Sequence, residues 1–184
     1  MLYVKSKPAD GYTVRGDESK TELTCAEAAT TATYTLTFPS GNSKGIQNYT
    51  STWSATIDNN SWSIVNFNNN NNGWAYIKCG SKSAASTASI ATSWAIKEAI
   101  TKVTVTIDKM TVSNVNSIKL QVSTDNSFTT DSIVEEIDIP KSQGDKVCTM
   151  TTPTANCYYK LVFDCKKGSS NGLVQISKVV YTNE

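Results

Sequence analysis

The sequence has no histidine, and Arg15 is the only arginine among its 184 residues. Without imidazole the chain has no Ser-His-Asp or Cys-His catalytic arrangement, no histidine metal ligand and no imidazole general base. Arginine side chains dominate protein contacts with phosphates and base edges, and the formal net charge is only +1. The composition therefore excludes histidine-based catalysis and argues against a nucleic-acid partner.

Long apolar runs are also missing, and charge is scarce. No segment is apolar enough to cross a membrane, and residues 1–13, MLYVKSKPADGYT, lack the hydrophobic run of a secretory signal. We therefore expect no membrane insertion. We also expect either a signal removed upstream or the native start of a protein that is not exported, such as a virion component. Charged residues make up 18% of the chain, below the usual ~25%, and Ser, Thr and Asn replace them, as is typical of all-β extracellular and surface proteins.

The cysteines show no CxxC pair and no zinc-ligand spacing. There are five of them: Cys25, Cys79, Cys148, Cys157 and Cys165. Cys157 and Cys165 would lie far apart along one strand and cannot bond each other. Cys148 and Cys157 flank a predicted hairpin turn at 151–154 and can pair in an oxidising compartment; the alternative is that they are small buried thiols.

Residues 1–31 differ from the rest and are expected to form an N-terminal arm or linker ahead of a domain at 32–184. From residue 33 onward, apolar and polar residues alternate with period two in short runs separated by turn signals, which indicates β-strands. The runs lie at 34–38, 53–57, 62–64, 74–79, 86–92, 103–107, 118–122, 133–139, 146–150, 157–165 and 173–181. Glu135 interrupts its run and predicts a bulge or a sheet edge.

This organisation predicts an all-β fold, an antiparallel two-sheet β-sandwich (jelly roll) with one short helical turn. We expect that turn at 92–100, where Thr92 is an N-cap candidate ahead of good helix formers. A parallel α/β fold would need long crossover helices, and the pattern contains none.

An asparagine run precedes one of the predicted strands. Asn68 to Asn72 are consecutive, and short amides favour turns over helix or sheet. In the strand that follows, Ala75, Ile77 and Cys79 alternate with three other side chains that would share the opposite face: Trp74, Tyr76 and Lys78. If the first set faces the core, two aromatic rings and a lysine stand beside an amide-rich loop.

Several segments together resemble a known family. They are 70–78, with the end of the asparagine run and its Trp-Tyr-Lys strand, and 99–103, 116–120, 158–165 and 168–179. Through them the chain from 33 to 182 resembles the galactose-binding-like jelly-roll modules, similar to carbohydrate-binding modules, of surface and secreted proteins of gut Bacteroidetes. A phage of these bacteria is an alternative source. The resemblance implies a non-catalytic β-sandwich that works in carbohydrate binding or adhesion, on a fold that hosts many functions.

Sugar sites combine an aromatic face for the apolar side of a pyranose with amides or a lysine for its hydroxyls. The candidate ligand-binding residues are therefore Trp74, Tyr76 and Lys78 with the loop amides Asn66, Asn68, Asn70 and Asn72, and Trp94 at the rim. The alternative is that Trp74 packs under its own loop and Tyr76 covers a sheet face. Trp62 alternates with Ile64 and is predicted to lie in the core, and Trp53 fits either role.

Two groups of oxygen-bearing residues remain. Asp125, Asn126, Ser127 and Asp131 form a turn in which Asx hydrogen bonding is the favoured role and calcium binding the alternative, since their spacing does not match an EF-hand loop. Asp108 and Asp164 are outward-facing strand carboxylates, and glycoside hydrolysis would need two that face each other.

The first functional hypothesis is a non-catalytic carbohydrate-binding or adhesion module for a neutral polysaccharide or surface glycan, extracellular or at the cell surface. The second is a structural virion protein, such as a capsid decoration, head fibre or tail component, that uses the sandwich for homo- or hetero-oligomeric assembly. An enzyme is not expected, and neither is a cofactor.

Overall fold

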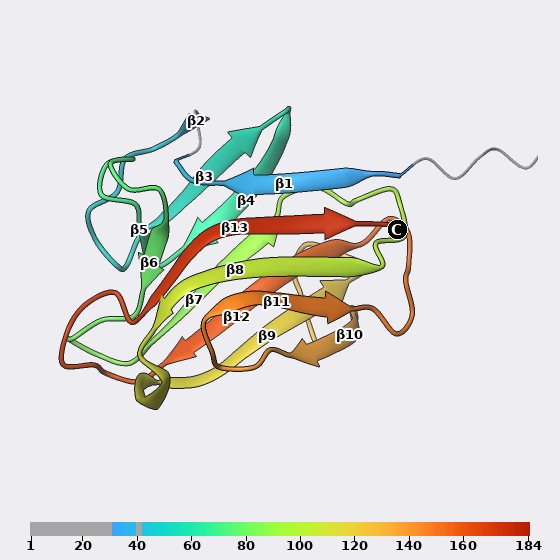
Figure 1. Cartoon of the computed structure of the whole chain (residues 1–184). Coiled ribbons are helices and arrows are strands. Elements are labelled where there is room, and N and C mark those ends of the chain that lie inside the picture. Colours follow the sequence, from blue (N-terminus) through green and yellow to red (C-terminus); the bar gives the residue numbers. More distant parts are fainter. Residues whose placement is uncertain (1–30, 40–41) are drawn as a thin grey trace, which may run out of the picture. The chain divides into compact units, whose positions relative to one another are not determined.

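Alternating apolar and polar residues build two antiparallel sheets in the computed structural model of the protein, which describes residues 31–39 and 42–184. The predicted arm at 1–31 falls outside these residues apart from Thr31, and Cys25 falls outside with it. Two layers of β-strands form the described part of the chain, which has no helix long and apolar enough to span a membrane (Figure 1). The predicted antiparallel β-sandwich is confirmed.

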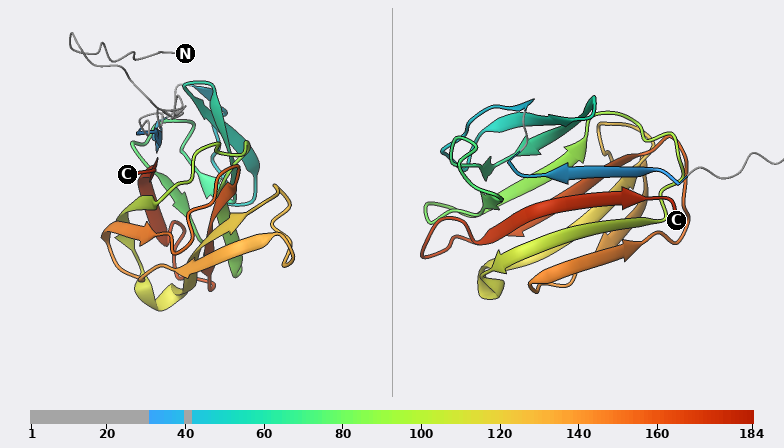
Figure 2. Two further views of the ribbon diagram at one scale, coloured as in Figure 1. Left: turned by 90° about the vertical axis from the view of Figure 1, so that its right-hand side faces the viewer. Right: turned by 45° about the horizontal axis from the view of Figure 1, so that its top comes forward.

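Within the described residues, one sheet has six strands and the other has seven. The six-stranded sheet runs in the order β11 (Gly144–Thr149), β8 (Lys102–Met110), β13 (Val174–Thr182), β6 (Ile77–Cys79) and β5 (Phe67–Asn68), with β1 (Thr33–Thr37) also paired to β13. The seven-stranded sheet runs in the order β10 (Ile133–Asp138), β9 (Val115–Ser123), β12 (Tyr158–Cys165), β7 (Ser86–Thr92), β4 (Asn60–Val65), β3 (Thr52–Ile57) and β2 (Asn42–Ser43). Figure 2 shows β1, β13, β8 and β11 side by side in one layer.

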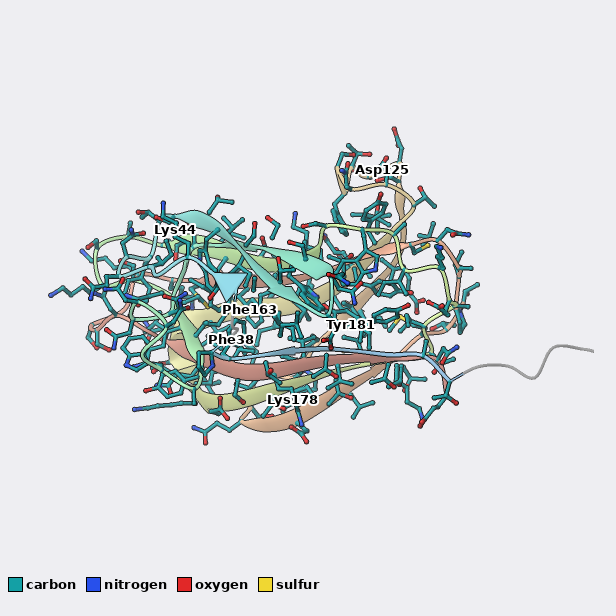
Figure 3. All side chains as sticks on the ribbon, turned by 90° about the horizontal axis from the view of Figure 1, so that it is seen from above. Phe38, Lys44, Asp125, Phe163, Lys178 and Tyr181 are labelled. Atoms are coloured by element: carbon teal, nitrogen blue, oxygen red, sulfur yellow. The ribbon has the colours of Figure 1, made fainter. Side chains whose placement is uncertain are left out.

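Aromatic side chains join the two sheets. Phe67 of the six-stranded sheet and Phe163 of the seven-stranded sheet make an edge-to-face pair, with ring centroids 5.5 Å apart. Tyr159 and Tyr181 make a second such pair at 5.8 Å. Figure 3 shows Phe163 and Tyr181 between the layers. Such pairs add about 0.5–1.5 kcal/mol beyond the area that they bury, so these contacts fix how the sheets face each other.

Two of the four tryptophans belong to this core. Trp62 is 1% exposed, as its alternation with Ile64 predicted. Trp53, which fitted either role, is also buried, and its indole N–H donates to the carbonyl of Phe67 at 2.9 Å. This hydrogen bond ties β3 of one sheet to β5 of the other.

One edge of β13 is shared by two strands. β1 pairs with β13 from Lys178 to Thr182, and β6 pairs with it from Val174 to Ile176. Between them, the backbone N–H of Phe38 donates to the carbonyl of Ser177 at 3.3 Å. β13 therefore offers β6 no free edge beyond the pair of Ile176 with Ile77, and the predicted strand at 74–79 is wrong for its first three residues. Ala75, expected to face the core, is exposed.

Two other local predictions are wrong. Residues 93–101 form a loop and not a helical turn, because the N–H of Ile96 donates to the carbonyl of Cys157 at 2.9 Å in an antiparallel bridge and not to its own segment. The one helix among the described residues is a 3-10 turn, η1 (Val112–Asn114). The predicted hairpin at 151–154 does not form either, since β11 and β12 belong to different sheets.

The predicted irregularity at Glu135 is confirmed. The register of β10 against β9 shifts between Ile133 and Glu135, and β10 is the last strand of its sheet. The Glu135 carboxylate accepts hydrogen bonds from the backbone N–H groups of Thr151 at 2.7 Å and Thr152 at 3.4 Å. The bulge thus turns a carboxylate toward the segment that crosses from one sheet to the other.

The cysteines of the sandwich are buried free thiols: Cys79, Cys148, Cys157 and Cys165. Cys148 and Cys157, considered above as a disulfide, are not bonded to each other and lie on either side of the crossing between the sheets. Burial raises the pKa of the Cys148 thiol to about 11. Burial also raises the pKa of Cys79 and Cys157, whereas a hydrogen bond with Cys79 lowers the pKa of Cys165. Because the thiolate is the reactive form, Cys79, Cys148 and Cys157 act as small apolar residues of the core.

Truncation of an inter-sheet aromatic ring tests this packing. Phe163→Ala removes a fully buried ring and its contact with Phe67, so we expect the free energy of unfolding to fall by about 3–5 kcal/mol. Chemical denaturation followed by tryptophan fluorescence measures it. The control Val147→Ala truncates a side chain that is 59% exposed and should change stability by less than about 0.5 kcal/mol. Similar losses in both variants would contradict the packing.

Candidate functional site

The asparagine loop owes its shape to left-handed backbone conformations. Asn70, Asn71 and Asn72 have φ angles of 52°, 54° and 63°, a region that asparagine tolerates better than most residues do. The side-chain oxygen of Asn68 accepts a hydrogen bond from the N–H of Asn70 at 2.7 Å. The N–H of Gly73 then donates to the carbonyl of Asn70 at 2.9 Å. The run is therefore a tightly wound turn.

Asn69, which the sequence did not single out, organises this loop. Its side chain is 2% exposed, and its oxygen accepts from the N–H groups of Ile46 at 2.7 Å and Asn72 at 3.2 Å. Its amide nitrogen donates to the carbonyl of Lys44 and the side-chain oxygen of Asn72, both at 2.9 Å. One buried amide thus ties the loop to residues 44–46, and its only sequence signal was the run itself.

Most of the predicted ligand-binding amides make hydrogen bonds within the chain. The side chain of Asn72 accepts from the Ser43 hydroxyl at 2.6 Å and donates to the Ser43 carbonyl at 2.9 Å. Asn66 donates to the carbonyl of Thr87 at 2.7 Å, and Asn68 is used by Asn70 as described. The side-chain amide of Asn70 has no hydrogen bond to another described residue and is half-buried. It is the predicted loop amide most available to a ligand.

Trp74, Tyr76 and Lys78, which we call the aromatic patch, lie together. The rings of Trp74 and Tyr76 are stacked, with centroids 5.4 Å apart and planes at 26°. The Lys78 ammonium lies 4.1 Å from the centroid of the Trp74 ring and 5.2 Å from that of Tyr76. All three side chains are partly exposed. Lys78 forms no ion pair with a carboxylate among the described residues.

The position of Lys78 depends on a glycine from a distant loop. Lys78 is opposite Gln175 in the pairing of β6 with β13, and its stem packs over Gly172. A Cβ on Gly172 would lie 2.7 Å from Lys78 Cδ and 3.4 Å from the Tyr49 hydroxyl, and its φ of +75° also favours glycine. Burial raises the pKa of the Tyr49 phenol, so that hydroxyl stays protonated. Sequence reasoning missed Tyr49, because only the tertiary fold brings it here.

Trp94 lies apart from the aromatic patch. Its ring packs edge-to-face on Trp62 at 4.9 Å and on Tyr34 at 5.9 Å. Tyr34 is opposite Tyr181, whereas Lys78 is opposite Gln175, and six residues of strand span about 20 Å. The Tyr34 hydroxyl donates to Glu98 at 2.6 Å, and this hydrogen bond is the main cause that raises the pKa of Tyr34 to about 12. Trp94 therefore belongs to the packing of the 93–101 loop.

The carboxylates considered for catalysis or calcium lie in separate places. Asp108 accepts from the Ser177 hydroxyl on the six-stranded sheet, and Asp164 accepts from Asn116 on the seven-stranded sheet. Asp125 accepts from the backbone N–H and hydroxyl of Ser127, and these hydrogen bonds lower its pKa. In the described ranges, no three His, Cys, Asp or Glu side chains are close enough to hold a metal ion.

Two solved structures similar to this chain are mutants of carbohydrate-binding modules of family 29. Each has a TM-score of 0.34 and 11% sequence identity and covers 83% of this chain; the alignments cover 92% and 86% of the respective modules. The second of these mutants probes the mechanism of ligand recognition by that family. No protein-family model and no curated protein sequence matches the chain.

The role of Asn69 is testable by mutation. Asn69→Ala removes four hydrogen bonds and leaves the buried N–H of Ile46 and the carbonyl of Lys44 without this partner. We expect a loss of about 2–4 kcal/mol in the free energy of unfolding, since each lost hydrogen bond costs about 1 kcal/mol or more when its partner stays buried. Chemical denaturation measures the loss. Asn71→Gly is the matched control, because glycine suits the φ of 54°, and it should be nearly neutral. A neutral Asn69→Ala would show that the loop does not depend on this amide.

Proposed function

We propose that the protein is a non-catalytic carbohydrate-binding module that recognises a neutral polysaccharide or surface glycan through the aromatic patch. The observation that carries the proposal is the stacked, partly exposed pair of Trp74 and Tyr76 with Lys78 over both rings. Aromatic faces suit the apolar C–H face of a pyranose, and an ammonium donates hydrogen bonds to its hydroxyls. Trp74 and Tyr76 lie just outside the paired part of β6, and Lys78 lies within it on the partly exposed face.

The contact between Lys78 and the rings is weak enough for a ligand to replace. A cation over an aromatic ring at an exposed site contributes about 0.5–1 kcal/mol. A sugar that takes the place of the ammonium on the rings loses little by breaking this contact, and the displaced ammonium remains within reach of the sugar hydroxyls. The hydroxyl of Tyr49, beside the same glycine, and the side chain of Asn70 supply further polar groups around the patch.

The placement of Asp108 and Asp164 supports a role without catalysis. Glycosidases need two carboxyl groups about 5–10 Å apart that flank the same bond. These two carboxylates lie on the outer faces of different sheets, and packed sheets are about 10 Å apart with outward side chains directed away from each other. They cannot act on one glycosidic bond.

We also propose that the protein acts outside the cell or on its surface, and that it comes from a Bacteroidetes species or from a phage that infects these bacteria.

The second candidate function, a structural virion protein, is favoured by one observation. The edge strands β10 and β11 carry the outward valines Val134 and Val147, which are 50% and 59% exposed. Open edges with apolar side chains favour pairing with other chains. In solution, such a component would form a stable oligomer that retains no glycan.

Removal of the stacking rings tests the first candidate. Trp74→Ala and Tyr76→Ala should each weaken retention by an immobilised neutral polysaccharide at least about tenfold, or about 1.4 kcal/mol. Affinity gel electrophoresis of the full chain across a panel of polysaccharides measures this retention. The thermal midpoint should stay nearly unchanged, since both rings are partly exposed.

Lys78→Ala should weaken retention through the loss of its hydrogen-bond donor, and Lys109→Ala, which truncates an exposed lysine elsewhere on the sandwich, is the matched control. If the wild-type chain is retained and the patch variants are retained equally well, the aromatic patch is not the binding site. If Trp74→Ala or Tyr76→Ala unfolds, the ring that it removes has a structural role.

A further inference from the structure

The outer face of the seven-stranded sheet contains an open hollow of about 320 Å³. Its floor is formed by outward residues of three adjacent strands: Ser63 and Val65 of β4, Ser89 and Ala91 of β7, and Lys160 of β12. One wall is the loop between β9 and β10, which contributes Asn126 and Phe128. This volume lies at the lower end of the ~300–1,000 Å³ that ligand pockets occupy, so it suits a small ligand unit.

The hollow exists because the outward residues in the middle of the sheet are small. Ala91 pairs with Lys160 on one side and with Ser63 on the other, and Ser89 pairs with Val162 and Val65. On the inner face of the same strands stand large residues such as Trp62 and Ile90. The strands thus carry large side chains on the core side and small ones on the outer side.

Hydrogen bonds within the loop between β9 and β10 stabilise the wall of the hollow. The buried hydroxyls of Ser123 and Ser132 meet at the base of the loop at 2.9 Å, and the N–H of Thr124 donates to the carbonyl of Ser132 at 3.0 Å. At the tip, the Asp125 carboxylate accepts from Ser127. Figure 3 shows the segment around Asp125 projecting away from the strands.

Phe128 adopts a backbone conformation that is unfavourable for an aromatic residue. Its φ is 51°, a region in which a bulky side chain costs on the order of 1–3 kcal/mol. The ring is partly exposed and lines the hollow, with the Lys160 ammonium 5.1 Å from its centroid. In this conformation the Phe128 ring lies at the hollow beside a cation and not in the core.

Several polar groups that line the hollow are free to bind. The hydroxyls of Ser63 and Ser89 and the side-chain amide of Asn126 make no hydrogen bond to another residue that the structure describes. Lys160 has no ion-pair partner among those residues, and no Asp or Glu lines the hollow. An aromatic face, two hydroxyls, an amide and an ammonium converge on one small space.

From this arrangement we propose that the hollow is a second saccharide-binding site, which takes one or two sugar units with the apolar face of a ring on Phe128. Lys160, Asn126 and the serine hydroxyls hydrogen-bond to the sugar hydroxyls or to a sugar carboxylate. The inference takes its ligand class from the proposed function but not its site, because the hollow lies on the seven-stranded sheet and the aromatic patch beside the six-stranded one.

The test is a titration of the full ¹⁵N-labelled chain with short saccharides, followed by backbone amide shifts. One arm uses neutral di- and trisaccharides, and the other uses oligomers of uronic acids. We expect saturable shifts at Ser89, Asn126 and Lys160 in at least one arm. Binding only in the second arm, weakened by salt, identifies the carboxylate as the group that Lys160 recognises. No saturable shift at these residues in either arm overturns the proposal.

Two variants separate this site from the rest of the molecule. Ala91→Leu fills the hollow from its outward floor, and Phe128→Gly removes the ring while it relieves the left-handed backbone strain. Each should raise the Kd at the hollow at least about tenfold and keep the dispersed spectrum of a folded protein. The matched control Thr104→Leu places the same side chain on the outer face of β8 and should leave the Kd unchanged.

Trp74→Ala distinguishes failure of this inference from failure of the proposed function. Binding at the hollow should survive in Trp74→Ala, while retention through the aromatic patch is lost. If saccharides shift only the patch, the proposed function stands and the second site is rejected. If Trp74→Ala abolishes the shifts at the hollow, or Ala91→Leu leaves them intact, the hollow is likewise not an independent site.

Discussion

The exposed chemistry of this protein depends on one constraint, the occupation of a single edge of β13 by both β1 and β6. A strand edge offers each N–H and C=O one partner, so β6 ends where Phe38 bonds to Ser177. The residues before Ile77 must leave the sheet, and they carry Trp74 and Tyr76. The aromatic patch exists because two strands compete for one edge.

The asparagine loop stabilises this exit from the sheet. Its amides bind backbone groups of residues 43–46 and of the loop itself, which fixes the chain just ahead of the residues that leave the sheet. Buried polar groups need such partners because an unsatisfied one costs about 1–3 kcal/mol. Asparagine amides that seemed suited to sugar hydroxyls are thus mostly part of the scaffold, and the rings and the lysine beside them are the groups left exposed.

The two sheets of the sandwich present different surfaces to solvent. Beside the six-stranded sheet, large side chains are displaced from a strand and stand out as a patch. On the seven-stranded sheet, small outward residues such as Ser89 and Ala91 leave a hollow under a rigid loop. If both places bind saccharide as proposed above, they can engage separate parts of one glycan, and linked weak contacts gain strength because the second binds at high effective concentration.

The sequence by itself determined the fold class, the core position of Trp62 and the irregularity at Glu135, since all three follow from a period-two pattern that is local. It also determined that the chain has no histidine chemistry. Only the tertiary structure decided that β6 is short, that β11 and β12 belong to different sheets, and that Trp94 joins Trp62 and Tyr34. It alone brought Tyr49 and Gly172 to Lys78 and formed the hollow. The physical reason is that alternation fixes which face a side chain takes, whereas pairing partners and edges depend on segments far apart in the chain.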